Sequence, residues 1–162
     1  MTVYAVRWAL VLSLTALAGC EERTPEQAKE KLGKLQVPLS DDSLIAKTKD
    51  PKSEDIAKML VQAGANPNAR QPNGMTALMS AAFNGQYDVA KTLIERGADV
   101  SATAKGYNAL CLAVERENKD MVKLLLAHDA DPQARPEGAL SALERAQQRK
   151  LNDLVDILQR KN

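Results

Sequence analysis

The sequence has few aromatic residues and almost no net charge. It contains one Trp, three Tyr and one Phe in 162 residues. A core must therefore consist of Leu, Ala, Val, Ile and Met, which suits short helices that pack closely on alanine. The formal net charge is +1, so there is no broad positive field to attract nucleic acid or an anionic membrane surface. We expect no nucleic-acid partner.

Motifs for catalysis or metal binding are also missing from the sequence. It has no glycine-rich phosphate loop, nucleophile elbow or zinc-protease motif. His128 is the only histidine, at the expected end of a helix, so a His/Cys metal cluster cannot form around it. Cys111 is expected to be a buried thiol, with an intermolecular disulfide or a sensor thiol as alternatives. We predict no enzyme, no cofactor and no metal site.

The first twenty residues have the features of an export signal. Arg7 precedes an apolar run over residues 8–18, which is too short for a transmembrane helix but has the length of a secretory h-region. The tetrapeptide Leu17-Ala18-Gly19-Cys20 resembles the lipobox of bacterial lipoproteins, in which lipid is attached to the cysteine and the peptide is cut before it. The resemblance implies a signal peptide over residues 1–19 and a lipid on Cys20. The alternatives are an ordinary signal peptide that ends in Cys and an uncleaved anchor.

The lipoprotein resemblance also implies a location. Lipoproteins carry two or three acyl chains, and two chains are enough for stable anchoring. Glu21 follows the cysteine, where an Asp in enteric-type bacteria retains lipoproteins in the inner membrane. The resemblance therefore implies anchoring by lipid in the cell envelope, at the outer membrane and facing the periplasm.

Residues 20–39 are predicted to form a lipidated tether and a capping helix. Thr24 and Pro25, with a Gln three residues after the Thr, are typical of a helix start. The helix should run from Pro25 to about Gln36, because a proline follows soon after. We expect its apolar stripe to lie over the first repeat, although a solvated stalk is the alternative. The stripe consists of Ala28, Leu32 and Leu35.

The rest of the chain, residues 40–162, repeats itself. Gly74, Gly106 and Gly138 recur every 32 residues, and a helix start follows each of them. In the unit that Gly74 opens, a first helix is predicted through Phe83 and a second over residues 87–96. Each helix has one apolar face that it cannot cover alone, so the units must stack.

A period near 33 with two short helices per unit resembles the ankyrin repeat. The resemblance implies an all-α solenoid of about four helix–turn–helix units, whose polar outer units act as caps. Two departures stand out. Thr76-Ala77-Leu78-Met79 replaces the family's Thr-Pro-Leu-His, and Asp129 replaces a glycine that ends a helix, which should cost some stability.

The resemblance also implies a protein partner, bound by the loop tips and the exposed side of the first helices. Met75 and Tyr107 occupy the same place after a turn glycine, and Met and aromatic side chains beside charges are typical of interface centres. Phe83 could instead pack against a neighbouring helix. The predicted partner-binding residues are Asn73, Met75, Phe83, Asn84, Lys105, Tyr107, Glu115 and Arg116.

The sequence thus predicts a monomeric, membrane-tethered periplasmic module that binds another protein as an adaptor or scaffold. One alternative is an inhibitor, such as an immunity protein that occludes a toxic periplasmic enzyme. Another is an adaptor for a periplasmic stress enzyme such as a catalase. All three remain open at this point.

Overall fold

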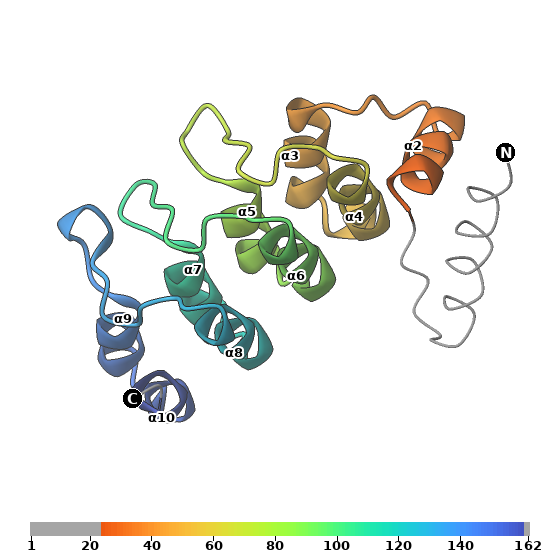
Figure 1. The fold of residues 1–162 in the computed structure, drawn as a ribbon. Helices are drawn as coiled ribbons and strands as arrows, with labels where there is room; N and C mark the ends of the chain where they lie inside the picture. The colour runs from red at the N-terminus through yellow and green to blue at the C-terminus, as the bar shows by residue number, and fades with distance from the viewer. Residues whose placement is uncertain (1–23, 161–162) are drawn as a thin grey trace, which may run out of the picture.

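The computed structural model describes residues 24–160, and in this range the chain is a curved stack of α-helices without β-strands (Figure 1). The predicted signal peptide and Cys20 lie outside the described residues. Two isolated antiparallel bridges, Arg70–Thr76 and Ala104–Tyr107, close the tips of two loops. The prediction of an all-α repeat solenoid is confirmed.

The helices form two rows. Helices of the inner row lie nearer the loops in Figure 1, and each is followed by an outer helix of the same unit. The inner row consists of α3 (Asp41–Lys49), α5 (Ala77–Asn84), α7 (Ala109–Glu115) and α9 (Ala142–Gln148). The outer row consists of α2 (Pro25–Lys34), α4 (Glu54–Gln62), α6 (Tyr87–Glu95), α8 (Lys119–Ala127) and α10 (Asn152–Gln159). Two 3₁₀ turns, Pro51–Ser53 and Pro136–Gly138, lie between helices.

Each inner helix begins at a polar N-cap. Thr76, Asn108 and Ser141 each accept a hydrogen bond from the backbone N–H three residues later, which satisfies one of the free donors at the helix start. Small residues such as Ala77 and Ala81 are fully buried and let neighbouring inner helices approach closely. The inner row therefore packs on alanine, as the scarcity of aromatic residues predicts.

Helices α2, α4, α6 and α8 of the outer row each carry a buried leucine and are followed by a left-handed residue. Leu93 is fully buried, Gly97 has a φ of 86°, and the Ala98 N–H donates to the Leu93 carbonyl at 2.9 Å. In the next unit Asp129 adopts the same conformation, with a φ of 65°. The prediction that Asp129 takes the place of a terminating glycine is confirmed.

Helix α2 belongs to the outer row. It packs against α4, its Leu32 is buried, and the Val37 N–H donates to the Leu32 carbonyl at 3.0 Å, just as at the ends of α4, α6 and α8. The predicted capping box at Thr24 is present. Helix α2 is thus the first described member of the outer row.

The expected place of Leu35 in the buried stripe was wrong. The helix ends at Lys34, two residues before the expected end, and Leu35 is 49% exposed. The cause is Gln36, whose φ of 55° turns the chain away from the helix. Val37 then packs against the core in place of Leu35.

Candidate functional site

The predicted partner-binding residues fall into two groups. Asn73, Met75, Lys105 and Tyr107 lie on the loop tips, where Gly74 and Gly106 have φ values of 85° and 75°. Phe83, Asn84, Glu115 and Arg116 lie at the C-terminal ends of α5 and α7. The two groups therefore occupy opposite ends of the inner helices.

On the loop tips, the side chains differ in how much of each is exposed to solvent. Asn73 is exposed, and its Oδ1 accepts the Met75 N–H at 3.1 Å, which fixes the turn. Met75 is half-buried against the core, so only part of it is available. Lys105 is exposed with a φ of 53°.

At the helix ends, the structure brings Phe83 and Arg116 together. The Arg116 guanidinium lies over the Phe83 ring, 4.1 Å from its centroid, and its Nε donates to the Phe83 carbonyl at 2.8 Å. Phe83 remains 41% exposed. Phe83 was expected either to face a partner or to pack against a neighbouring helix, and both hold in part. The ring contacts Arg116 of the next unit and also remains partly exposed to solvent. A cation–π contact and a hydrogen bond hold Arg116 in one orientation.

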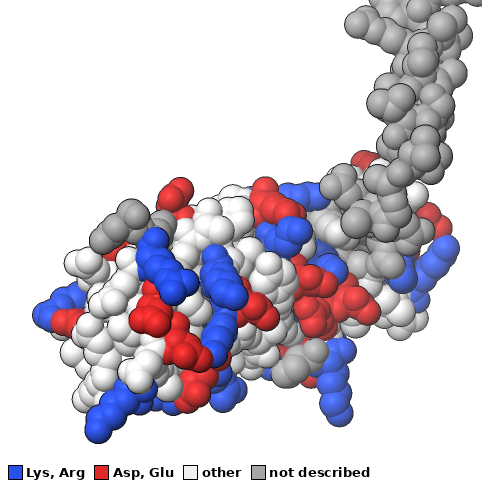
Figure 2. All heavy atoms as spheres, turned by 90° about the horizontal axis from the view of Figure 1, so that it is seen from below, with Lys and Arg blue, Asp and Glu red and all other residues white. Residues whose placement is uncertain are grey.

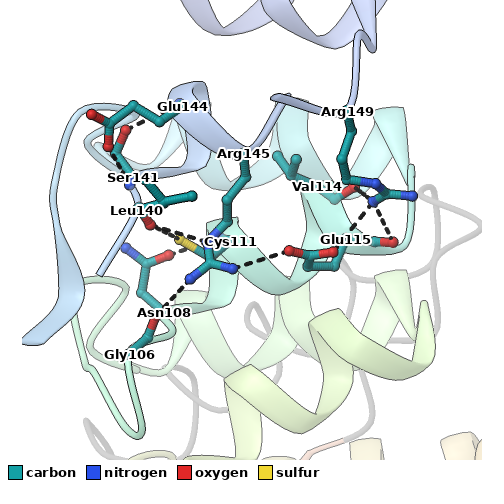
Figure 3. Close-up of polar contacts among 10 residues, drawn as sticks. All are labelled: Gly106, Asn108, Cys111, Val114, Glu115, Leu140, Ser141, Glu144, Arg145 and Arg149. Atoms are coloured by element: carbon teal, nitrogen blue, oxygen red, sulfur yellow. Dashed lines mark hydrogen bonds and ion pairs between the residues drawn. The ribbon is translucent and has the colours of Figure 1, made fainter. Parts of the chain in front are cut away.

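Arg145 from α9 connects the two groups, and Figure 3 shows its contacts with Gly106, Leu140 and Glu115. Its guanidinium is 4.2 Å from the centroid of the Tyr107 ring, and its Nη1 donates to the Glu115 carboxylate at 3.0 Å. Its other two nitrogens donate to backbone carbonyls, Nε to Leu140 and Nη2 to Gly106, both at 3.0 Å. The side chain of Arg145 is only 11% exposed. Tyr107 and Glu115 are therefore fixed by one arginine.

A second arginine, Arg149, holds the end of α7. Its Nη1 donates to the Glu115 carbonyl at 2.9 Å, and its Nη2 donates to the Glu117 carboxylate at 2.7 Å. Arg116 does the same for α5, and the Asn84 Nδ2 donates to the Thr48 carbonyl of α3 at 2.7 Å. Each of these side chains caps the inner helix of the preceding unit, where carbonyl groups lack partners.

Sequence reasoning missed Arg145 and Arg149 as members of this surface. A signal was present, because Asn84, Arg116 and Arg149 occupy the same place in successive units. The contacts themselves join residues 30 to 39 positions apart, and their geometry becomes apparent only once the units are stacked.

Charges of both signs are interspersed on the surface, as Figure 2 shows for one face. Glu144 accepts the Ser141 N–H and pairs with Arg135, and these contacts lower the pKa of its carboxyl. Burial raises the pKa of the Cys111 thiol, which is fully buried. Its Sγ lies 3.9 Å from the Leu140 carbonyl oxygen. Cys111 is thus a buried thiol in this chain, as expected.

Between residues 24 and 160, no three residues among His, Cys, Asp and Glu lie close enough together to hold a metal ion. His128 is exposed at the end of α8. Within the same range, no helix has the length and apolar character needed to span a membrane.

The fold and surface define a helical-repeat binding protein, and comparison with known families agrees. The family of ankyrin repeats matches residues 44–136 in three copies, which is more than half of the chain. This protein belongs to the ankyrin-repeat family. Ankyrin repeats are non-catalytic modules for protein–protein interaction, so a protein partner is the coarse functional conclusion.

Two relatives illustrate the breadth of the family. The chain is 30% identical over 144 residues to a Treponema pallidum protein named for its ankyrin repeats, covering 85% of this chain and 48% of the relative. It is 40% identical over 93 residues to the B-cell lymphoma 3 protein homolog of Mus musculus, covering 56% of this chain and 21% of the relative. The chain spans half the length or less of these relatives.

Proposed function

We propose that this protein is a lipid-anchored adaptor of the bacterial envelope, which holds one partner protein beside the membrane in the periplasm. The observation that carries the binding role is the fixed pair Phe83–Arg116, exposed to solvent on the inner row. Side chains that are already held lose less conformational freedom on binding than free ones do. The same argument applies to Tyr107 beneath Arg145.

The anchor part of the proposal rests on Cys20 and the chain that follows it. The peptide units between Cys20 and Thr24 span at most about 14 Å. A lipid on Cys20 would therefore keep helix α2 close to the membrane surface. A partner bound to the inner row would be held near the membrane with it.

The binding role is tested by capture from gently crosslinked envelopes, with the full lipidated chain as bait. The variant Met75→Ala/Phe83→Ala/Tyr107→Ala should lose the captured partner. Tyr87→Ala is the matched control, because Tyr87 is as exposed as Phe83 but lies on outer helix α6. Thermal melts of all variants establish that each is folded. A partner retained by the triple variant, or lost with Tyr87→Ala, would place binding elsewhere.

The anchor role is tested by Cys20→Ala. The variant should remain folded and move from the membrane fraction to the soluble fraction. If it stays on membranes, the N-terminal segment is an uncleaved anchor. If the captured partner is a toxic enzyme that the chain inactivates, the chain is an inhibitor and the adaptor proposal is wrong.

A further inference from the structure

We infer that Arg116 is the docking point for a carboxylate, so that the partner presents an acidic segment with an apolar side chain beside it. The inference rests on the proposed function and goes further by naming the chemistry that the inner row recognises. The apolar neighbour packs on the exposed part of Phe83, while the carboxylate pairs with the guanidinium above it.

The guanidinium of Arg116 is held in one orientation. Its Nε donates to the Phe83 carbonyl at 2.8 Å, and its Cζ lies over the Phe83 ring. Among the described residues, neither Nη1 nor Nη2 of Arg116 has an acceptor or a carboxylate within ion-pair distance, although the side chain is exposed. These two nitrogens form the edge that binds a carboxylate through two parallel hydrogen bonds.

The acidic residues on either side of Arg116 in the sequence already have partners. Glu115 pairs with both Arg145 and Arg149, at 3.0 and 3.4 Å, and Glu117 pairs with Arg149 at 2.7 Å. The fourth unit thus neutralises the two carboxylates that flank Arg116. This group of three arginines and two glutamates therefore has one positive charge in excess, and that charge lies on Arg116.

The probe for this inference is a random twelve-residue peptide library, selected against the full chain in detergent. Enriched peptides should contain Asp or Glu next to an apolar residue more often than the unselected library. For the tightest peptide, Arg116→Gln should weaken binding about 10- to 100-fold, which is the range for a charge-assisted hydrogen-bonded pair. Replacing the peptide's carboxylate by the corresponding amide should weaken it similarly. The two changes together should be no worse than either alone, because they remove the same contact.

Arg96→Gln is the matched control. Arg96 is also an exposed arginine that donates to the preceding unit, from Nη1 to the Gln62 carbonyl at 3.3 Å, but it lies on the outer row. This variant should bind the peptide as the wild type does. Equal melting temperatures of the two variants would show that the loss at Arg116 is not a loss of folding.

The outcomes separate this inference from the proposed function. Selected peptides without acidic residues, no selected peptide, or full binding by Arg116→Gln would each overturn the inference. The proposed function is decided by the envelope capture: a partner lost with the triple variant but kept by Arg116→Gln leaves the inner row as the binding surface and removes the carboxylate from it.

Discussion

At the residue scale, several side chains on the inner row join the stack together and remain partly exposed. Arg145 is the clearest case, since its three nitrogens donate to three different acceptors and its plane covers Tyr107. Arg116 makes fewer contacts and is more exposed. The same residue type thus joins the units at one position, while at the other its Nη1 and Nη2 have no acceptor among the described residues.

We predict that Arg145→Ala destabilises the protein by about 2–4 kcal/mol, because it leaves two carbonyls and a partly buried carboxylate without this donor. Arg145→Lys should recover little, since an ammonium cannot reach three acceptors in the guanidinium plane. Urea unfolding gives both values. Lys123→Ala is the control, because its contact with Asp120 is exposed and 4.0 Å long. A loss at Arg145 as small as that of the control would contradict the prediction.

Cys111 should react slowly in the folded protein. Burial raises the pKa of its thiol, so it stays protonated at neutral pH, and reagents cannot reach it. In the Cys20→Ala variant, alkylation at pH 8 should be at least about 100-fold slower than in urea. Stability should be constant with pH below the thiol's unfolded pKa of about 8.5 as far as this group is concerned, and should decline above it. Rapid alkylation of the folded chain would show that the third unit opens readily.

At the element scale, helix boundaries were largely predictable because they depend on local chemistry. Caps such as Thr76 and terminators such as Gly97 act within one helical turn, and the predicted helices around them match within two residues. The place of α2 in the outer row was not predictable from the period. Leu32 lies 28 residues before Leu60, whereas Leu60 and Leu93 are 33 apart, because the loop from α2 to α3 (residues 35–40) is shorter than the loop from α4 to α5 (residues 63–76).

Two glycines test this account of helix ends. Gly97 has a φ of 86°, whereas Gly33 lies within α2, and an added methyl group would meet nothing within 4 Å at either position. Gly97→Ala should therefore cost about 1–2 kcal/mol through backbone strain alone. Gly33→Ala should stabilise by about 0.5–1 kcal/mol, because alanine restricts the unfolded chain. Shifts of the same sign in the two melting temperatures would show that packing, not backbone conformation, governs these positions.

The candidate surface was less predictable than the helices. Its position was expected from the repeat. The two ion pairs that Arg145 and Arg149 form with the Glu115 carboxylate, however, depend on side-chain geometry across units. A residue at the same place in each unit can act differently: Asn84 caps a helix with an amide, and Arg116 does so with a guanidinium.

At the scale of the whole molecule, a stack of units has only neighbour-to-neighbour contacts. Helix α6 packs between α4 and α8, whereas among the described helices α10 has an outer-row neighbour, α8, on one side alone. Stability in such a stack is a sum of unit and interface contributions, so the ends should open first. Leu93 in α6 and Leu158 in α10 are both almost fully buried, and they offer the same substitution at a central and a terminal position.

We predict that Leu93→Ala and Leu158→Ala, each costing about 2–5 kcal/mol locally, differ in how far the loss spreads. Leu158→Ala should lower hydrogen-exchange protection in α9 and α10 and leave the amides of α4 to α6 unchanged, because the terminal unit opens without the others. Leu93→Ala should lower protection across all units, because the centre cannot open without separating the two halves. Native-state hydrogen exchange of both variants measures this directly. Equal losses throughout the chain in both variants would mean that the stack unfolds as one cooperative unit, and a partner bound at Arg116 would then stabilise both ends of the protein equally.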